Sequence, residues 1–124
     1  MTRPVLAALA MLLCAAAMAR DFPAPQRVAD GVYVLEGARE HFSRANAGDI
    51  ANTGFIATPA GAVVIDTGAS LRYGQAQRAA VRATTGRDAV QVYITHAHPD
   101  HFLGNQAYAD LPVHALSATA ARIA

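Results

Sequence analysis

The sequence predicts an α/β fold, and three features of the chain indicate this class. Four short runs with β-branched or aromatic residues are typical of strands, at residues 32–35, 52–57, 62–66 and 90–94, and residues 111–115 predict a further short strand. A helical pattern covers residues 71–85, between the third and fourth runs. Hydrophobic residues make up 53% of the 124, which is enough for the core of one small domain.

Residues 1–19 have the pattern of a secretory signal peptide. Arg3 stands near the start, an apolar run begins at Val5, and AMA at residues 17–19 is a small-residue cleavage site. The run is too short and too rich in alanine for a membrane span. The large residue before Cys14 disfavours a lipid anchor there. We therefore predict a periplasmic or secreted protein with no stable membrane anchor after cleavage.

Cleavage after Ala19 would leave 124 − 19 = 105 residues, with nine of the ten arginines and all nine acidic residues. The formal net charge would then fall from +1 to zero. No basic patch with interleaved aromatic residues is present, so the sequence does not predict a nucleic-acid partner. The one cysteine leaves with the signal, so a metal site in residues 20–124 must use nitrogen and oxygen ligands.

The strands are connected by turns with clear signals. Residues 37–49 are polar and predict a loop, in which His41 is expected to be solvated, although it could line the mouth of a pocket. The second and third strands should form a hairpin through TPAG at residues 58–61. Proline fixes φ at the second position of that turn, and glycine takes the fourth.

The helix over residues 71–85 has Ser70 in position to cap its start and Gly86 in position to end it. Its apolar stripe and its solvated face separate clearly. The stripe consists of Tyr73, Ala76, Ala80 and Val81, and the solvated face of Arg72, Gln75, Arg78 and Arg82.

Four potential metal ligands follow the fourth strand, namely His96, His98, Asp100 and His101. In extended backbone, side chains two residues apart point the same way, so His96 and His98 can hold one ion. Pro99 should stop the strand and start a turn that re-aims Asp100 and His101 toward a second ion. Imidazole and carboxylate suit zinc, and iron or manganese fit less well. A histidine-rich surface loop is the alternative, but the spacing and the preceding strand favour the metal site.

The last part of the chain carries weaker signals. Residues 105–109 predict a short helix, and His114 on the final strand is expected to be a packed or edge histidine rather than a ligand. Ser117 is expected to cap a last helical turn, within which the sequence stops at Ala124.

Two motifs carry a resemblance to a known family. THAHPDH at residues 95–101 resembles the HxHxDH signature of the metallo-β-lactamase fold superfamily of hydrolases, with Gly104 following as in that family. VIDTG at residues 64–68 is similar to a second element of the family and stands in the family's order. One departure is Asn105, which stands where a second glycine commonly follows. The resemblance covers residues 28–123.

The resemblance implies an αβ/βα sandwich of which this chain holds the N-terminal half. We therefore expect residues 20–124 to be the N-terminal portion of such a domain, truncated at the C-terminus, with the remaining metal ligands downstream. It also implies that Asp66 lies near the metal site and orients the ligand loop by hydrogen bonds. From the residues alone, Asp66 could equally be a turn or helix-capping residue.

The implied activity is hydrolysis of a small-molecule ester, thioester or amide by metal-activated water. His96 and His98 would hold the first zinc, and His101 the second together with Asp100, which would act catalytically by orienting the nucleophile. Zinc lowers the pKa of bound water from above 15 to about 7, which supplies hydroxide at neutral pH. The charge of the zinc ion would also stabilise the oxyanion that forms when hydroxide attacks the carbonyl.

Within the superfamily, EGARE at residues 36–40 and NAGDIANTGF at residues 46–55 resemble the quinoprotein relay system zinc metallohydrolases. Those are exported proteins linked to periplasmic quinoprotein and sulfur-oxidation systems, which the resemblance implies as partners. Two alternatives remain. One is a mononuclear iron persulfide dioxygenase-like enzyme of the same fold, and the other is a non-catalytic module that binds metal or a partner.

Overall fold

The computed structural model describes residue 22 and residues 24–124 of the chain. The predicted signal peptide, residues 1–19, lies outside this part. Within the described part of the chain, no helix is both long enough and apolar enough to cross a membrane.

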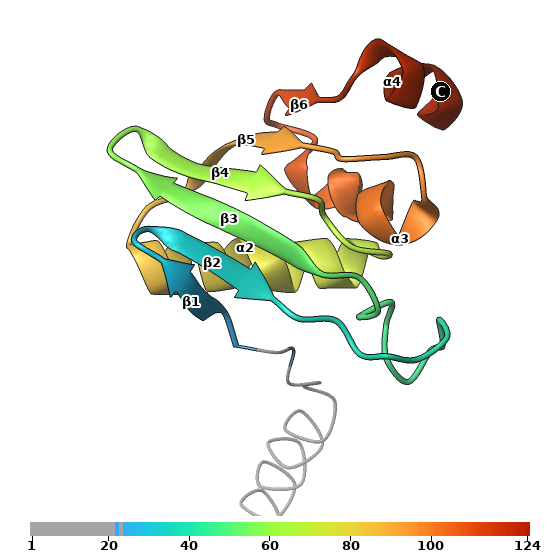
Figure 1. Ribbon diagram of the computed structural model, residues 1–124, viewed down its shortest axis with the longest axis horizontal. Helices are drawn as coiled ribbons and strands as arrows, with labels where there is room; N and C mark the ends of the chain where they lie inside the picture. Colours follow the sequence, from blue (N-terminus) through green and yellow to red (C-terminus); the bar gives the residue numbers. More distant parts are fainter. Residues whose placement is uncertain (1–21, 23) are drawn as a thin grey trace, which may run out of the picture.

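One six-stranded sheet forms the centre of the molecule, with its strands side by side in the order of the sequence (Figure 1). The strands are β1 (Gln26–Ala29), β2 (Val32–Leu35), β3 (Thr53–Thr58), β4 (Gly61–Ile65), β5 (Ala89–Tyr93) and β6 (Val113–His114). The first four strands pair antiparallel, whereas β4 with β5 and β5 with β6 pair parallel. The change from antiparallel to parallel pairing at β4 is the feature that positions the functional site.

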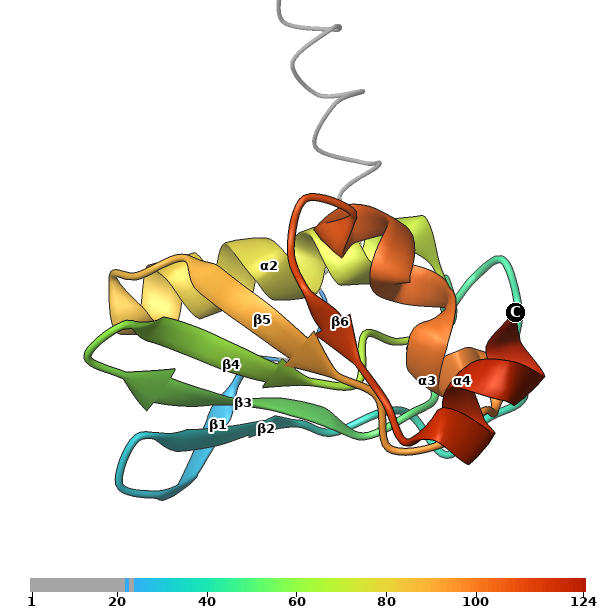
Figure 2. The same cartoon turned by 90° about the horizontal axis from the view of Figure 1, so that it is seen from above.

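Helix α2 (Leu71–Thr85) connects β4 to β5 and lies along one face of the sheet (Figure 2). The remaining elements are α3 (Pro99–Phe102), the 3-10 helix η1 (Leu103–Tyr108) and α4 (Ser117–Ile123). The core forms between this face and the helices. Its buried side chains include Leu35, Phe55, Val64, Val92 and Ile94 from the sheet side and Val81 and Tyr108 from the helices. The predicted α/β class is therefore confirmed.

The predicted bounds of α2 are also confirmed, because both caps act as expected. Ser70 Oγ accepts a hydrogen bond from the Tyr73 N–H at 3.0 Å, which satisfies one of the free amides at the helix start. Gly86 adopts φ 67° and its N–H donates to the Arg82 carbonyl at 2.9 Å. The predicted hairpin between β3 and β4 forms with Thr58 opposite Gly61.

Three local predictions were wrong or incomplete. β1 was not predicted as a strand, because all four of its residues are exposed and an edge strand of this kind has no apolar pattern. Pro99 starts the helix α3 rather than a simple turn, since proline is well suited to the first helical position. Ser117 is the first residue of α4 and not its cap, which is Leu116.

Arg78 is not simply part of a solvated face. Its guanidinium donates to both carboxylate oxygens of Asp110, at 2.6 and 2.8 Å, and to the Ala107 carbonyl at 2.8 Å. These hydrogen bonds hold the pKa of Asp110 down at about 2. Arg78 therefore ties α2 to η1 and to the turn that follows it.

Candidate metal centre

The parallel pairing of β4 with β5 decides where the site forms. The carboxyl ends of parallel strands lie at the same edge of a sheet, where α/β proteins commonly bind ligands. Ile65 is opposite Tyr93, and one step further the Asp66 N–H donates to the Tyr93 carbonyl at 2.9 Å. Asp66 therefore lies beside Thr95 and His96, which follow β5.

Three imidazoles and a carboxylate gather in residues 95–101, which we call the ligand loop. The ring centroid of His96 lies 4.6 Å from that of His98 and 4.1 Å from that of His101. Asp100 Oδ2 lies 3.6 Å from His101 Nε2. The structure thus brings together the four side chains that the sequence indicates as ligands, and their binding of an ion stays a prediction.

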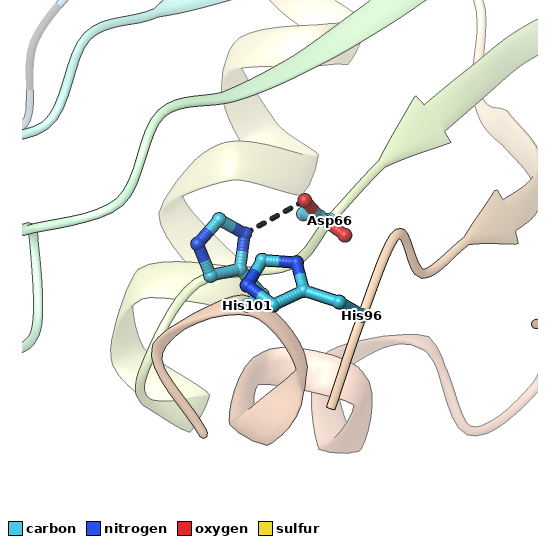
Figure 3. Close-up of side chains that lie close together, drawn as sticks. All are labelled: Asp66, His96 and His101. Carbon is cyan, nitrogen blue, oxygen red and sulfur yellow. Dashed lines mark hydrogen bonds and ion pairs between the residues drawn. The ribbon is translucent and has the colours of Figure 1, made fainter. Parts of the chain in front are cut away.

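Asp66 is the buried anchor of the ligand loop. Asp66 is only 3% exposed, and its backbone adopts the left-handed conformation, with φ 58°. Oδ1 accepts a hydrogen bond from the Thr95 N–H at 2.8 Å. Oδ2 accepts one from the Thr95 hydroxyl at 2.8 Å. It also accepts one from His101 Nδ1 at 2.7 Å (Figure 3). Asp66 does not cap α2, because Ser70 does.

These hydrogen bonds decide which ring nitrogen carries the proton in His96 and in His101. A carboxylate only accepts, so His101 Nδ1 must be protonated to bond Asp66. The single proton of the Thr95 hydroxyl goes to Asp66, so the hydroxyl accepts from His96 Nδ1, 2.8 Å away. In neutral His96 and His101, Nε2 is then the atom with a free lone pair. A histidine held this way by a carboxylate is the usual arrangement of metal-binding histidines.

The donor set fits a zinc ion. One ligand atom from each of Asp66, His96 and His101 lies within 4.8 Å of the others. The Asp66 oxygens already accept three hydrogen bonds, so this carboxylate is better suited to orient the imidazoles than to bind the ion itself. His98 and Asp100 lie outside this trio and complete the nitrogen and oxygen donors that zinc takes.

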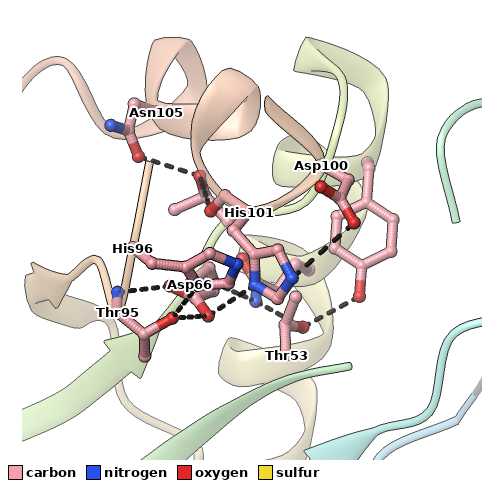
Figure 4. Close-up of polar contacts among 10 residues, drawn as sticks. Thr53, Asp66, Thr95, His96, Asp100, His101 and Asn105 are labelled. Atoms are coloured by element: carbon pink, nitrogen blue, oxygen red, sulfur yellow. Dashed lines mark hydrogen bonds and ion pairs between the residues drawn. The ribbon is translucent and has the colours of Figure 1, made fainter. Parts of the chain in front are cut away.

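A backbone clamp holds the ligand loop against the end of β4. The Thr67 N–H donates to the His101 carbonyl, and the Gly104 N–H donates to the Gly68 carbonyl, both at 2.9 Å. A Cβ on Gly104 would lie 1.9 Å from the Thr67 carbonyl oxygen, so only glycine fits. Asn105, which departs from the family pattern, adds to the clamp, because its Oδ1 accepts from the Thr67 hydroxyl at 2.8 Å (Figure 4).

In the part of the chain that the structure describes, two cavities border the proposed metal ligands. The larger, of about 560 Å³, is bordered by Asp100 and His101 on one side and by the loop after β2 on the other. Its polar lining from that loop consists of Glu36, Arg39, Glu40, His41 and Asn52. His41 is exposed, as expected, and it also lines this cavity. The second, of about 390 Å³, is largely apolar and includes Phe42, Ile50, Leu103 and Asp100.

Asn46 holds the shape of the loop that lines these cavities. Its side chain is buried, and its Oδ1 accepts from the N–H groups of Ser43 and Gly48 at 2.9 and 3.1 Å. Its Nδ2 donates to the His41 carbonyl at 2.8 Å. A single amide therefore fixes the backbone on both sides of it.

A buried polar network behind Asp66 was missed by the sequence analysis. Gln77 donates from Nε2 to the Asp66 carbonyl and to the Thr53 hydroxyl, both at 2.9 Å, and accepts from the Tyr108 hydroxyl at 2.8 Å. Thr53 also contacts the Tyr73 hydroxyl at 2.8 Å. Burial raises the pKa of Tyr73 to about 12 and also raises that of Tyr108.

The spacing of the helix contained a signal for this network. Gln77 lies four residues after Tyr73 and four before Val81, so it had to share their buried face. A different histidine, His114 on β6, is exposed and stacks on Tyr93 with ring centroids 4.9 Å apart, as an edge histidine would.

A family model described as the metallo-beta-lactamase superfamily matches residues 46–117. This match includes Asp66 and the whole ligand loop. The curated proteins contain no match to the chain.

Solved structures with the same fold include metallo-beta-lactamases. One from Hirschia baltica has a TM-score of 0.65 and 20% identity, with 80% of this chain and 45% of that one covered. FIM-1 from Pseudomonas aeruginosa, in its mono-zinc form, has a TM-score of 0.66 and 14% identity, with 85% and 47% covered. The chain thus spans about half the length of these structures, and the shared fold confirms the predicted fold class.

Proposed function

Because the chain belongs to the metallo-beta-lactamase superfamily, we propose that it acts in metal-dependent hydrolysis at the ligand loop. The observation that carries the proposal is the orientation of the imidazoles. Asp66 and Thr95 hold the Nδ1 atoms of His101 and His96, which leaves both Nε2 atoms for a metal. This arrangement suits the binding of an ion.

Zinc is the ion we propose, with two ions in the complete site. His96 and His98 would hold one ion, since their rings lie face to edge 4.6 Å apart. His101 Nε2 and Asp100 Oδ2, 3.6 Å apart, would contribute to the second. Zinc bound there would lower the pKa of a water molecule to about 7 and polarise a substrate carbonyl.

The chain's own residues would position the reactants. Asp100 lies at the border of both cavities, where its carboxylate can accept a proton from the attacking water and orient it. The larger cavity offers polar groups, and the smaller one offers apolar contacts from Phe42, Ile50 and Leu103. A small-molecule ester, thioester or amide with an apolar substituent matches this combination.

We also propose export to the periplasm or beyond, and a place among the quinoprotein relay system zinc metallohydrolases. The pattern of residues 1–19 supports export. The run at residues 46–55 supports the subgroup, and it begins at Asn46, which organises the loop beside the cavities. A periplasmic quinoprotein or sulfur-oxidation system is the partner this subgroup suggests.

One observation favours a second candidate, an iron enzyme that oxidises persulfides. The trio of Asp66, His96 and His101 has the two-histidine, one-carboxylate composition of non-haem iron sites. In that enzyme Asp66 would bind the ion directly. A single bound iron together with oxygen uptake on a persulfide would support this candidate over zinc hydrolysis.

The proposal is tested by measuring zinc affinity through competition with a coloured chelator, together with turnover of ester, thioester and β-lactam substrates. The double variant His96→Ala/His98→Ala should lose at least about 100-fold in zinc affinity, because two ligands of one ion are removed. The control His114→Ala removes an exposed histidine outside the ligand loop and should bind as the unaltered chain does. Equal zinc affinity in the double variant would contradict the proposal.

A further inference from the structure

Gln77, on α2, donates a hydrogen bond from its side-chain amide to the backbone carbonyl of Asp66. It is 1% exposed, and its amide makes three hydrogen bonds. A buried amide is costly unless all its groups are paired. At this helix position an apolar residue would suit the surrounding core better, so the amide needs an explanation.

The orientation of the amide is fixed by its partners. The Asp66 carbonyl can only accept, so the Gln77 atom 2.9 Å from it must be Nε2. The second proton of Nε2 points to the Thr53 hydroxyl, and Oε1 receives the Tyr108 hydroxyl proton. Turning the amide over would set two acceptors against each other at Asp66. These partners therefore permit only one orientation of the Gln77 amide.

Asp66 needs this support because its backbone is left-handed. A φ of 58° is unfavourable for a residue with a side chain, even though aspartate adopts it more readily than most. The Gln77 hydrogen bond holds the carbonyl of this residue, while the Asp66 N–H is held by the Tyr93 carbonyl at 2.9 Å. Both peptide groups of Asp66 are thus held in the conformation in which its carboxylate faces Thr95 and His101.

We infer that Gln77 is a positioning residue for the metal centre. It holds Asp66 in the conformation from which the Asp66 carboxylate orients His101 directly and His96 through the Thr95 hydroxyl. The inference rests on the proposed function, because it assigns Gln77 a part in metal binding at the same site. Among the hydrogen bonds and cavity linings of the described residues, Gln77 neither bonds a proposed metal ligand nor lines a cavity beside one.

The variant Gln77→Met tests the inference, since methionine has a similar length and shape but no amide. Without the amide, the Asp66 peptide loses its restraint and the carboxylate can leave the imidazoles. Zinc affinity should fall by about tenfold, at the lower end of the range for outer partners of metal ligands. The visible absorption spectrum of the cobalt-loaded chain should shift as well, because that spectrum reports ligand geometry.

The matched control is Val81→Ala, a large-to-small change at a fully buried position on the same helix. It should lower the free energy of unfolding while leaving zinc affinity and the cobalt spectrum unchanged. This separates positioning from general destabilisation. If Gln77→Met does not fold, Tyr108→Phe removes only the hydrogen bond to Gln77 Oε1 and should produce a smaller shift in the same spectrum.

A double-mutant cycle with Asp66→Asn shows whether Gln77 acts through Asp66. The losses of zinc affinity should not add, because Gln77 has nothing to position once the carboxylate is gone. Additive losses would overturn the inference, as would a Gln77→Met chain with unaltered zinc affinity and cobalt spectrum. If the inference about Gln77 fails but the unaltered chain binds zinc, the proposed function still holds. If the unaltered chain does not bind zinc, both the inference and the proposed function are overturned.

Discussion

Asp66 joins two polar clusters that differ in their exposure to solvent and in how completely their side chains are hydrogen-bonded. Its carboxylate faces the ligand loop, where the histidines are partly or fully exposed and the imidazoles gather around one another. Its carbonyl faces the buried network of Thr53, Tyr73 and Gln77, in which each side-chain group bonds another at 2.8–2.9 Å.

The difference separates groups that fix the fold from groups that remain available. A fully paired buried network specifies one arrangement and has no capacity for a ligand. In the ligand loop, by contrast, the Nδ1 atoms of His101 and His96 donate to Asp66 and Thr95, and their Nε2 atoms remain available to bind a metal ion. The buried network therefore holds Asp66 in place, and Asp66 in turn leaves the imidazoles of the ligand loop free to bind. Three predictions test this separation of roles.

The largest effect is expected at Gly104, where the clamp joins the ligand loop to the end of β4. The variant Gly104→Ala would place a Cβ 1.9 Å from the Thr67 carbonyl oxygen, so backbone must move. We expect a loss of about 3 kcal/mol in the free energy of unfolding, at the upper end for overpacking. Urea denaturation measures this loss.

Gly86→Ala is the matched control for that variant. Gly86 also has a positive φ, of 67°, but nothing lies within 4 Å of a Cβ placed there. Its cost should be about 1 kcal/mol, from the left-handed backbone alone. Equal losses for the two variants would show that the clamp tolerates displacement and that the ligand loop is not held as tightly as the contacts indicate.

An intermediate effect is expected at Thr95, whose hydroxyl lies between Asp66 and His96. The variant Thr95→Val keeps the shape and the backbone hydrogen bond to Asp66 but removes the hydroxyl. Zinc affinity should fall by about tenfold, since His96 loses the partner that orients it. Thr95→Ser keeps the hydroxyl and should restore the affinity. If Thr95→Val binds zinc normally, the hydroxyl has no part in orienting His96.

The two clusters were unequally predictable from the sequence. The spacing of His96, His98, Asp100 and His101 indicates a joint site because neighbours in sequence must be neighbours in space. The ends of α2 were predicted because Ser70 and Gly86 act locally. The exposed strand β1 has no periodic signal, so only its pairing with β2 reveals it.

The buried network depends on contacts between distant parts of the chain. The Tyr108 hydroxyl and Gln77 are 31 residues apart, and Thr53 and Gln77 are 24 apart. Helical spacing could have placed Gln77 on the buried face, but its partners follow only from the register of β3 and the packing of η1. The role of Asp66 likewise required the parallel pairing of β4 with β5, which brings it beside Thr95.

The smallest effect is expected at Tyr73, at the far end of the buried network, and it depends on pH. Burial raises the pKa of the Tyr73 hydroxyl from 10.0 to about 12 in the folded chain. The unfolded chain therefore releases this proton first, so the stabilisation is complete below about pH 10 and is lost as pH rises toward 12. Tyr73→Phe should cost about 1 kcal/mol at pH 7, for one hydrogen bond, and should flatten the loss of stability above pH 10.

Zinc affinity at pH 7 should stay unchanged in this variant, because the Thr53 hydroxyl still accepts the hydrogen bond from Gln77 Nε2. Urea denaturation at pH 7, 10 and 11 measures the two slopes, and parallel curves for both chains would mean that the Tyr73 hydroxyl ionises as easily in the folded network as in water.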